Sequence, residues 1–247
     1  MRRTLTSLLI SLVYGVGPAH PAARDIEKIP CVRVSAECPS RPEPPVTSYR
    51  AIRRMSATND RYKLTGWLEA WTELEAGKGF TFGVATEGGS GYIRTKVLRK
   101  VLEAEGDAVA AKEGDRAGLT SENYVFGEPE RIEDGLLRIS LRPRRADKLL
   151  IDGAMFVTES DRDLVRIEGR LSKAPSFWTR RVEIVRTYGR IDGHRVALET
   201  TSTASVLVAG ESSFTMRYEY ERINGVAVGA PAPVPAPGPA PRLPIGW

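Results

Sequence analysis

The chain has few of the residue types from which most metal and catalytic sites are built. Its 247 residues include only two cysteines and two histidines, His20 near the start and His194. A four-ligand zinc site would need all four of these side chains, and His20 would stand at the extreme end of the chain that is left after the predicted export signal described below, so we expect no bound metal. A Ser-His-acid triad could draw only on His194, which follows a predicted hairpin turn, and a hydrolase is therefore disfavoured.

Other catalytic signatures are also missing. The glycine-rich stretch 87–91 lacks the Lys-Ser/Thr pair of a phosphate loop and the third glycine of a dinucleotide fingerprint. A pair of carboxylates that catalyses glycoside hydrolysis stays an open alternative. The sequence does not indicate which two carboxylates would form the pair, since most candidates alternate with apolar residues, as expected on the solvent-exposed face of a strand. These candidates are Asp161, Asp163, Glu168, Glu199, Glu219 and Glu221. We expect no enzyme and no cofactor.

A strong charge of one sign is absent too. The 36 basic and 31 acidic residues leave a net charge of +5, or +3 without Arg2 and Arg3 of the predicted export signal described below. Nucleic acid is not an expected partner, because the basic residues are scattered and do not cluster with aromatic residues. No segment after the export signal approaches the roughly 20 apolar residues that span a bilayer.

The first residues have the pattern of a secretory signal. Arg2 and Arg3 precede an apolar core at 8–16, and the small residues Gly17 and Ala19 would suit cleavage after Ala19. We therefore expect export, to the periplasm. In an oxidising compartment Cys31 and Cys38, the only two cysteines, would most simply form a disulfide.

Strand patterns dominate the region 154–224. The clearest strand places Phe214, Met216, Tyr218 and Tyr220 on one face and Ser213, Thr215, Arg217, Glu219 and Glu221 on the other. This period of two is typical of a half-buried strand. Asp-Gly dipeptides at 134–135, 152–153 and 192–193 predict tight hairpin turns, so the region is expected to form an antiparallel meander that curls.

One segment, 92–112, changes to the helical period. Val97, Val101, Ala104 and Ala108 form an apolar stripe with Leu98, Leu102 and Val109 beside it. Gly106 is expected to bend or break the helix.

We therefore predict a mainly β fold, a curled antiparallel half-barrel of about eleven strands with an amphipathic helix over its concave face. Four segments follow: a signal peptide at 1–19, a Pro-rich arm with the cysteine pair at 20–48, the half-barrel domain at 49–225, and a tail at 226–247. The tail is rich in Pro and Ala, so it is expected to be disordered.

The strand region resembles a known family. The runs Asp163-Leu164-Val165-Arg166-Ile167-Glu168-Gly169, 175–178 (Pro-Ser-Phe-Trp), 182–188 and Tyr218-Glu219-Tyr220 are similar to the C-terminal half of the LolA-like proteins that sort outer-membrane lipoproteins. The order of export signal, early strands, helix and meander matches as well. Over residues 49–224 this resemblance implies a half-open barrel of about eleven strands whose apolar hollow accepts acyl chains.

The resulting hypothesis is an exported, non-catalytic carrier of the cell envelope that binds a lipid or the acyl chains of a lipoprotein. Its lining is predicted to include Val97, Leu98, Val101, Leu102, Phe214, Met216, Tyr218 and Tyr220. The alternative is an envelope protein-interaction or stress-sensing module with the same fold and another protein as its partner. A filled core with an exposed apolar edge would favour that alternative, because unpaired strand edges can accept a strand from a partner.

Overall fold

The computed structural model describes residues 44–132, 135–174, 179–207 and 209–229. The predicted signal peptide at 1–19, most of the Pro-rich arm with Cys31 and Cys38, and the tail beyond residue 229 lie outside these residues. Within the described part no helix is long and apolar enough to cross a membrane.

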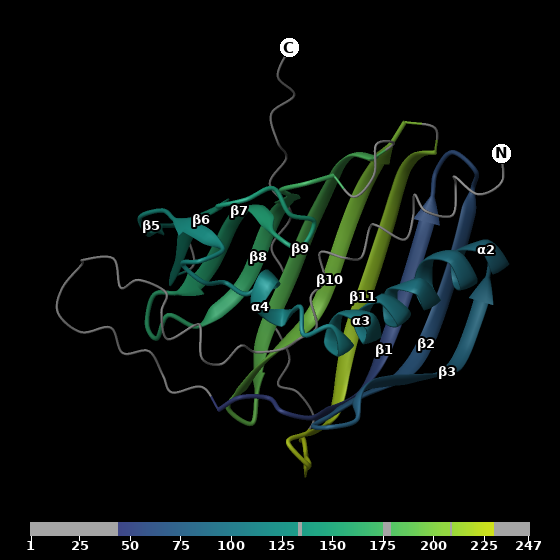
Figure 1. Cartoon of the computed structure of the whole chain (residues 1–247), viewed down its shortest axis with the longest axis horizontal. Coiled ribbons are helices and arrows are strands. Elements are labelled where there is room, and N and C mark those ends of the chain that lie inside the picture. The colour runs from purple at the N-terminus through teal and green to yellow at the C-terminus, as the bar shows by residue number, and fades with distance from the viewer. Residues whose placement is uncertain (1–43, 133–134, 175–178, 208, 230–247) are drawn as a thin grey trace.

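Twelve strands form one open antiparallel sheet, which confirms the predicted mainly β fold with a covering helix (Figure 1). The strands are β1 Tyr49–Asn59, β2 Leu64–Glu75, β3 Gly79–Gly89, β4 Tyr124–Phe126, β5 Glu130–Arg131, β6 Leu136–Pro143, β7 Ile151–Thr158, β8 Leu164–Leu171, β9 Thr179–Ile191, β10 His194–Val206, β11 Gly210–Ile223 and β12 Val226–Ala227. Their order is β3-β2-β1-β11-β10-β9-β8-β7-β6-β4, with β12 beside β11 and β5 beside β6.

This order explains why a helix covers the sheet. The chain builds β1 to β3 outward to one edge, then resumes at β4 on the opposite edge and returns strand by strand until β11 pairs with β1. The connection between the two edges must cross a face of the sheet. It does so as a helix of 20 residues, made of α2 (Gly91–Ile93), a π-helical segment (Arg94–Leu98) and α3 (Arg99–Ala110), followed by the short α4 (Gly114–Ala117).

We call residues 91–110 the covering helix. It begins at Ser90, whose side chain accepts a hydrogen bond from the Ile93 amide at 3.5 Å. Ile93 packs directly on β2, because Gly66 has no side chain there; a Cβ atom at Gly66 would lie 2.9 Å from the Ile93 side chain. The expected break at Gly106 is wrong, since α3 continues to Ala110 and Gly106 fits against Phe80.

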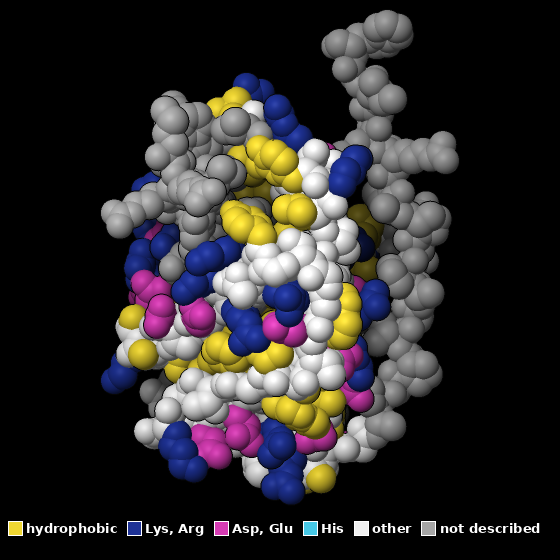
Figure 2. Space-filling view, turned by 90° about the vertical axis from the view of Figure 1, so that its right-hand side faces the viewer, with side chains coloured by type: hydrophobic (Ala, Val, Ile, Leu, Met, Phe, Trp, Pro, Cys, Tyr) yellow, Lys and Arg dark blue, Asp and Glu magenta, His cyan; other side chains and the backbone are white. Residues whose placement is uncertain are grey.

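The predicted alternation of β11 is confirmed. Phe214, Met216 and Tyr220 are buried and Tyr218 is half-buried on the side of the helix, whereas the residues between them face outward. On the outer face Arg54 of β1 is paired with both Glu69 of β2 and Glu219 of β11. Figure 2 shows acidic and basic side chains interspersed over one side of the molecule, with hydrophobic side chains between them.

Two of the predicted turns have different outcomes. Asp192 and Gly193 join β9 to β10 with φ values of 50° and 84°, as a primed hairpin turn requires. The turn at Asp152-Gly153 is wrong: both residues lie inside β7, and Gly153 stands opposite Gly169 of β8. Glycine is needed there because the two backbones approach closely; a Cβ atom on Gly153 would lie 2.1 Å from the Glu168 carbonyl oxygen.

Replacing Gly153 by alanine is therefore expected to destabilise the protein by about 1–3 kcal/mol, because β7 and β8 must separate to admit the methyl group. Gly83 of β3 is the matched control, since a Cβ atom there meets nothing within 4 Å. Gly83→Ala should leave the unfolding free energy unchanged or slightly higher. Urea unfolding of both variants checks this, and equal stabilities would contradict the close approach.

The two ends of the described chain are tied together. The Asn224 side chain accepts hydrogen bonds from the amides of Thr47 (2.7 Å) and Ser48 (3.2 Å) and donates one to the Pro45 carbonyl (2.8 Å). The sheet continues past residue 225 into β12, so the first residues of the predicted tail belong to the fold.

Candidate ligand-binding site

The eight residues predicted to line a ligand site are brought together between the covering helix and the sheet. Six of them belong to one hydrophobic cluster, with Tyr218 packed against it and Tyr220 in the adjoining cluster. The six are Val97, Leu98, Val101, Leu102, Phe214 and Met216. Each of these side chains is 5% exposed or less. Their predicted contact with a ligand stays a prediction, because here they pack against one another.

A buried ion pair lies in the middle of this apolar layer. Arg53 of β1 is fully buried and Glu105 of α3 is 3% exposed. Arg53 Nη2 donates to Glu105 Oε1 at 2.7 Å, and Arg53 Nη1 donates to Glu105 Oε2. The Tyr49 hydroxyl accepts from Arg53 Nη2 at 2.7 Å and donates to Glu105 Oε1 at 3.3 Å. This network joins the covering helix to the centre of the sheet.

Aromatic rings enclose the pair on the sheet side. The Arg53 guanidinium carbon lies 4.8 Å from the ring centroid of Tyr218 and 5.1 Å from that of Phe80. Such contacts stabilise a cation that has left water. Burial lowers the pKa of Arg53, but the Glu105 carboxylate raises it, and the net direction is upward. The guanidinium is therefore always charged.

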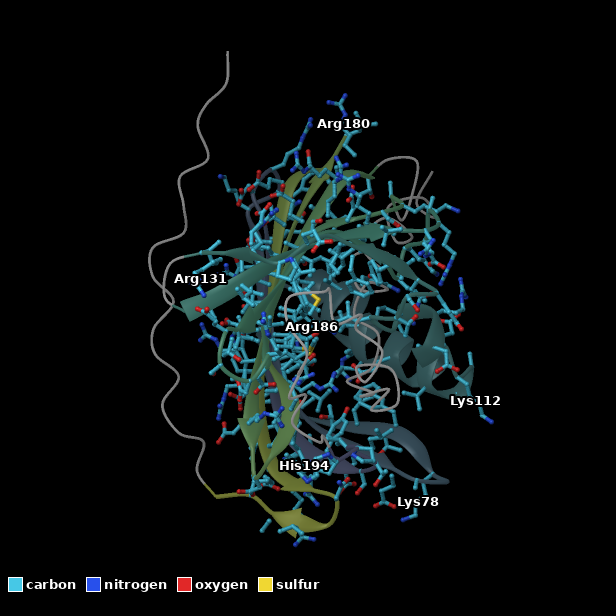
Figure 3. All side chains as sticks on the ribbon, turned by 90° about the vertical axis from the view of Figure 1, so that its left-hand side faces the viewer. Lys78, Lys112, Arg131, Arg180, Arg186 and His194 are labelled. Carbon is cyan, nitrogen blue, oxygen red and sulfur yellow. The ribbon has the colours of Figure 1, made fainter. Side chains whose placement is uncertain are left out.

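A second arginine, Arg186 of β9, lies in the same layer. Its Nε donates to Thr200 Oγ1 of β10 at 3.2 Å, and Tyr188 and Tyr218 are its aromatic neighbours. No carboxylate forms an ion pair with Arg186 among the residues that the structure describes, and its Nη2 atom is buried without a hydrogen-bond partner there. Figure 3 shows Arg186 in the interior between sheet and helix, whereas Arg131, Arg180, Lys78, Lys112 and His194 lie at the periphery.

The electrostatics of this layer follow from the two arginines. Burial raises the pKa of Tyr218, although the neighbouring cations Arg53 and Arg186 lower it. Burial also raises the pKa of Tyr220, whose hydroxyl has no hydrogen-bond partner in the described part of the chain. Both tyrosines are therefore neutral at physiological pH. With one carboxylate and two guanidinium groups, the layer has one positive charge that none of its own carboxylates balances.

Sequence reasoning missed these charged residues, although each one interrupts an apolar pattern. Arg53 follows Tyr49 and Ala51 and precedes Met55 and Ala57 on the inward face of β1. Arg186 similarly continues the buried series Val182 and Ile184 of β9, and Glu105 lies four residues after Val101 on the helix. A charged residue at a position where the periodicity predicts an apolar one was the signal that could have identified them.

The residues weighed for catalysis lie elsewhere. His194 is at the β9–β10 turn, with Nδ1 3.1 Å from the Pro44 carbonyl oxygen. Asp163 pairs with Arg190 (2.6 Å) and Arg195 (2.8 Å). Over residues 44–229, outside the gaps given above, no group of three or more His, Cys, Asp or Glu side chains could hold a metal ion.

Comparison with known proteins gives fold-level likenesses alone. No protein-family model matches the chain, and no curated protein matches it. A crystal structure of a DUF1329 family protein from Desulfovibrio piger ATCC 29098 is similar, with 10% identity, a TM-score of 0.37, and coverage of 74% of this chain and 88% of that one.

A second similar structure is a domain named as an outer membrane lipoprotein-sorting protein, from Vibrio parahaemolyticus. Its identity is 8% and its TM-score is 0.33, over 71% of this chain and 86% of that one. This is the kind of protein that the sequence resemblance indicated. At these identities and TM-scores neither structure identifies a cargo, and the proposals below depend on the residues of this chain.

Proposed function

We propose that this protein is an exported, non-catalytic carrier that binds a lipid or the acyl chains of a lipoprotein on the concave face of its sheet. One observation supports this most directly: the covering helix packs chiefly against β1, β2 and β3, at one end of a sheet of twelve strands. The inward residues of the other strands are apolar as well, among them Ile139, Met155, Ile167 and Ile184. The apolar face therefore extends beyond the strands that the helix contacts, and these residues are buried in the same hydrophobic cluster.

Such a face suits an aliphatic ligand. Each methylene group that moves from water to an apolar surface contributes about 0.8 kcal/mol, so an acyl chain gains affinity from length without needing specific polar contacts. Phe80, Phe82 and Val84 of β3 are only half-buried where they pack against the core, which leaves apolar area beside the helix. Export to the periplasm, through the predicted signal at 1–19, is part of the same proposal.

The test is a binding assay on protein purified from its native envelope without detergent. Native mass spectrometry should find co-purifying acyl chains, and a fluorescent fatty acid should bind saturably and displace them. Val101→Trp, on the inward face of the helix, should lower that uptake several-fold while the circular dichroism spectrum stays that of a folded β protein. Val125→Trp is the control, because Val125 is 46% exposed.

The alternative function, binding of another envelope protein, has two observations in its favour. The residues between the covering helix and the sheet pack against one another, so the core there is filled. Strand β3 is an edge strand of 11 residues that pairs with β2 on one side, and it contains neither proline nor a basic residue. Such an edge can accept a strand from a partner. Absence of any adduct together with no saturable fatty-acid binding would favour this alternative over the lipid carrier.

A further inference from the structure

The inward face of the sheet contains a cation without a matching anion. Arg53 and Glu105 neutralise each other in a bidentate pair, but Arg186 has no carboxylate partner among the described residues. A protein rarely keeps a charge inside without compensation, because removal of an ion from water is costly. A neutral side chain of similar length would pack at this position at lower cost. An anion bound beside Arg186 would supply the missing compensation.

The side chains around Arg186 are not completely buried. Arg186, Tyr188 and Tyr218 are half-buried, although they lie on the inward face among side chains that are fully buried, such as Ile184 and Met216. Their accessible surface is thus on the inner side of the molecule, where Figure 3 places Arg186. The Nε atom is held by Thr200 Oγ1, which orients the guanidinium. The Nη2 atom has no partner in the described part of the chain and is buried, so a ligand that binds it must displace the side chains that cover it.

We propose that Arg186 binds the carboxylate of an aliphatic acid whose chain lies on the apolar concave face. This inference rests on the proposed lipid-binding function and specifies the ligand as an anionic amphiphile. The charge count favours a group of charge −1, such as a carboxylate: one uncompensated positive charge balances it, whereas a phosphate monoester of nearly −2 would need a second free cation. A guanidinium also matches a carboxylate geometrically, through two parallel hydrogen bonds.

The experiment compares palmitate with hexadecanol, which has the same chain and no charge, in equilibrium binding to the full mature protein. The wild type should bind palmitate about 10- to 100-fold more tightly, the factor expected for hydrogen bonds to a charged group. Arg186→Met should lose that preference and bind both ligands like hexadecanol. Arg180→Met is the matched control, an exposed arginine on the same strand, and it should keep the preference.

Stability and a conservative variant complete the test. Arg186→Met should be at least as stable to urea as the wild type, because it removes an uncompensated charge. Arg186→Lys keeps the charge without the planar fork and should retain only part of the preference. A wild type that binds both ligands equally, or an Arg186→Met variant that still prefers palmitate, would overturn this inference and leave lipid binding intact. No saturable binding of either ligand would overturn the proposed function as well.

Discussion

Replacing Glu105 by alanine is expected to destabilise the protein by about 3–5 kcal/mol, the cost of leaving a buried charge without its partner. Arg53 would keep its full burial and lose both carboxylate hydrogen bonds. The neighbouring Arg186 is already uncompensated, so the layer would contain two unbalanced cations. The midpoint of urea unfolding should fall accordingly, with the dependence on urea concentration unchanged.

Two further variants separate charge from packing in this prediction. Glu103→Ala is the control, because Glu103 is an exposed residue of the same helix that pairs with Lys100. Its removal should cost no more than about 0.5 kcal/mol. The double variant Arg53→Met, Glu105→Leu should recover most of the lost stability, since apolar groups can replace a buried pair. Equal losses for Glu105→Ala and Glu103→Ala would mean that the Arg53–Glu105 pair is not buried.

Changing Val101 to aspartate should cost more than about 3 kcal/mol or detach the covering helix from the sheet. Val101 is 1% exposed and belongs to the main hydrophobic cluster. The new carboxylate would therefore be buried among apolar side chains that cannot donate hydrogen bonds to it. The neighbouring position provides a matched control. Lys100→Asp introduces the same side chain on the outward face of the helix, where it loses the pair with Glu103 and adds a like-charge contact worth about 0.5 kcal/mol.

Thermal unfolding followed by circular dichroism would measure both changes. Hydrogen exchange over residues 91–110 would show whether Val101→Asp releases the helix before the sheet unfolds, as expected if the inward stripe holds it in place. Equal melting temperatures for the two variants would show that the wrong face of the helix has been assigned to the core.

Sequence patterns predicted the structure correctly where it depends on residues that are close together in the chain. The alternation in β11 depends on adjacent residues, as does the apolar stripe of the covering helix, and both lie as predicted. The turn at Asp192-Gly193 is correct because a primed turn needs positive φ at two successive residues. The same dipeptide at 152–153 misled the prediction, since Gly153 is required by the backbone of Gly169 across the sheet, which a local pattern cannot show.

The sequence by itself therefore determined the fold class, the inward faces of strands and helix, and the apolar residues that lie between them. Only the tertiary structure decided which polar groups meet there. Arg53, Glu105 and Arg186 are separated by 52 and by more than 80 residues, and they come together because β1 pairs with β11 and the chain crosses the sheet as a helix. Strand pairing between distant segments is set by the register and packing of the whole sheet, so the ion pair and the unbalanced arginine are properties of the folded molecule.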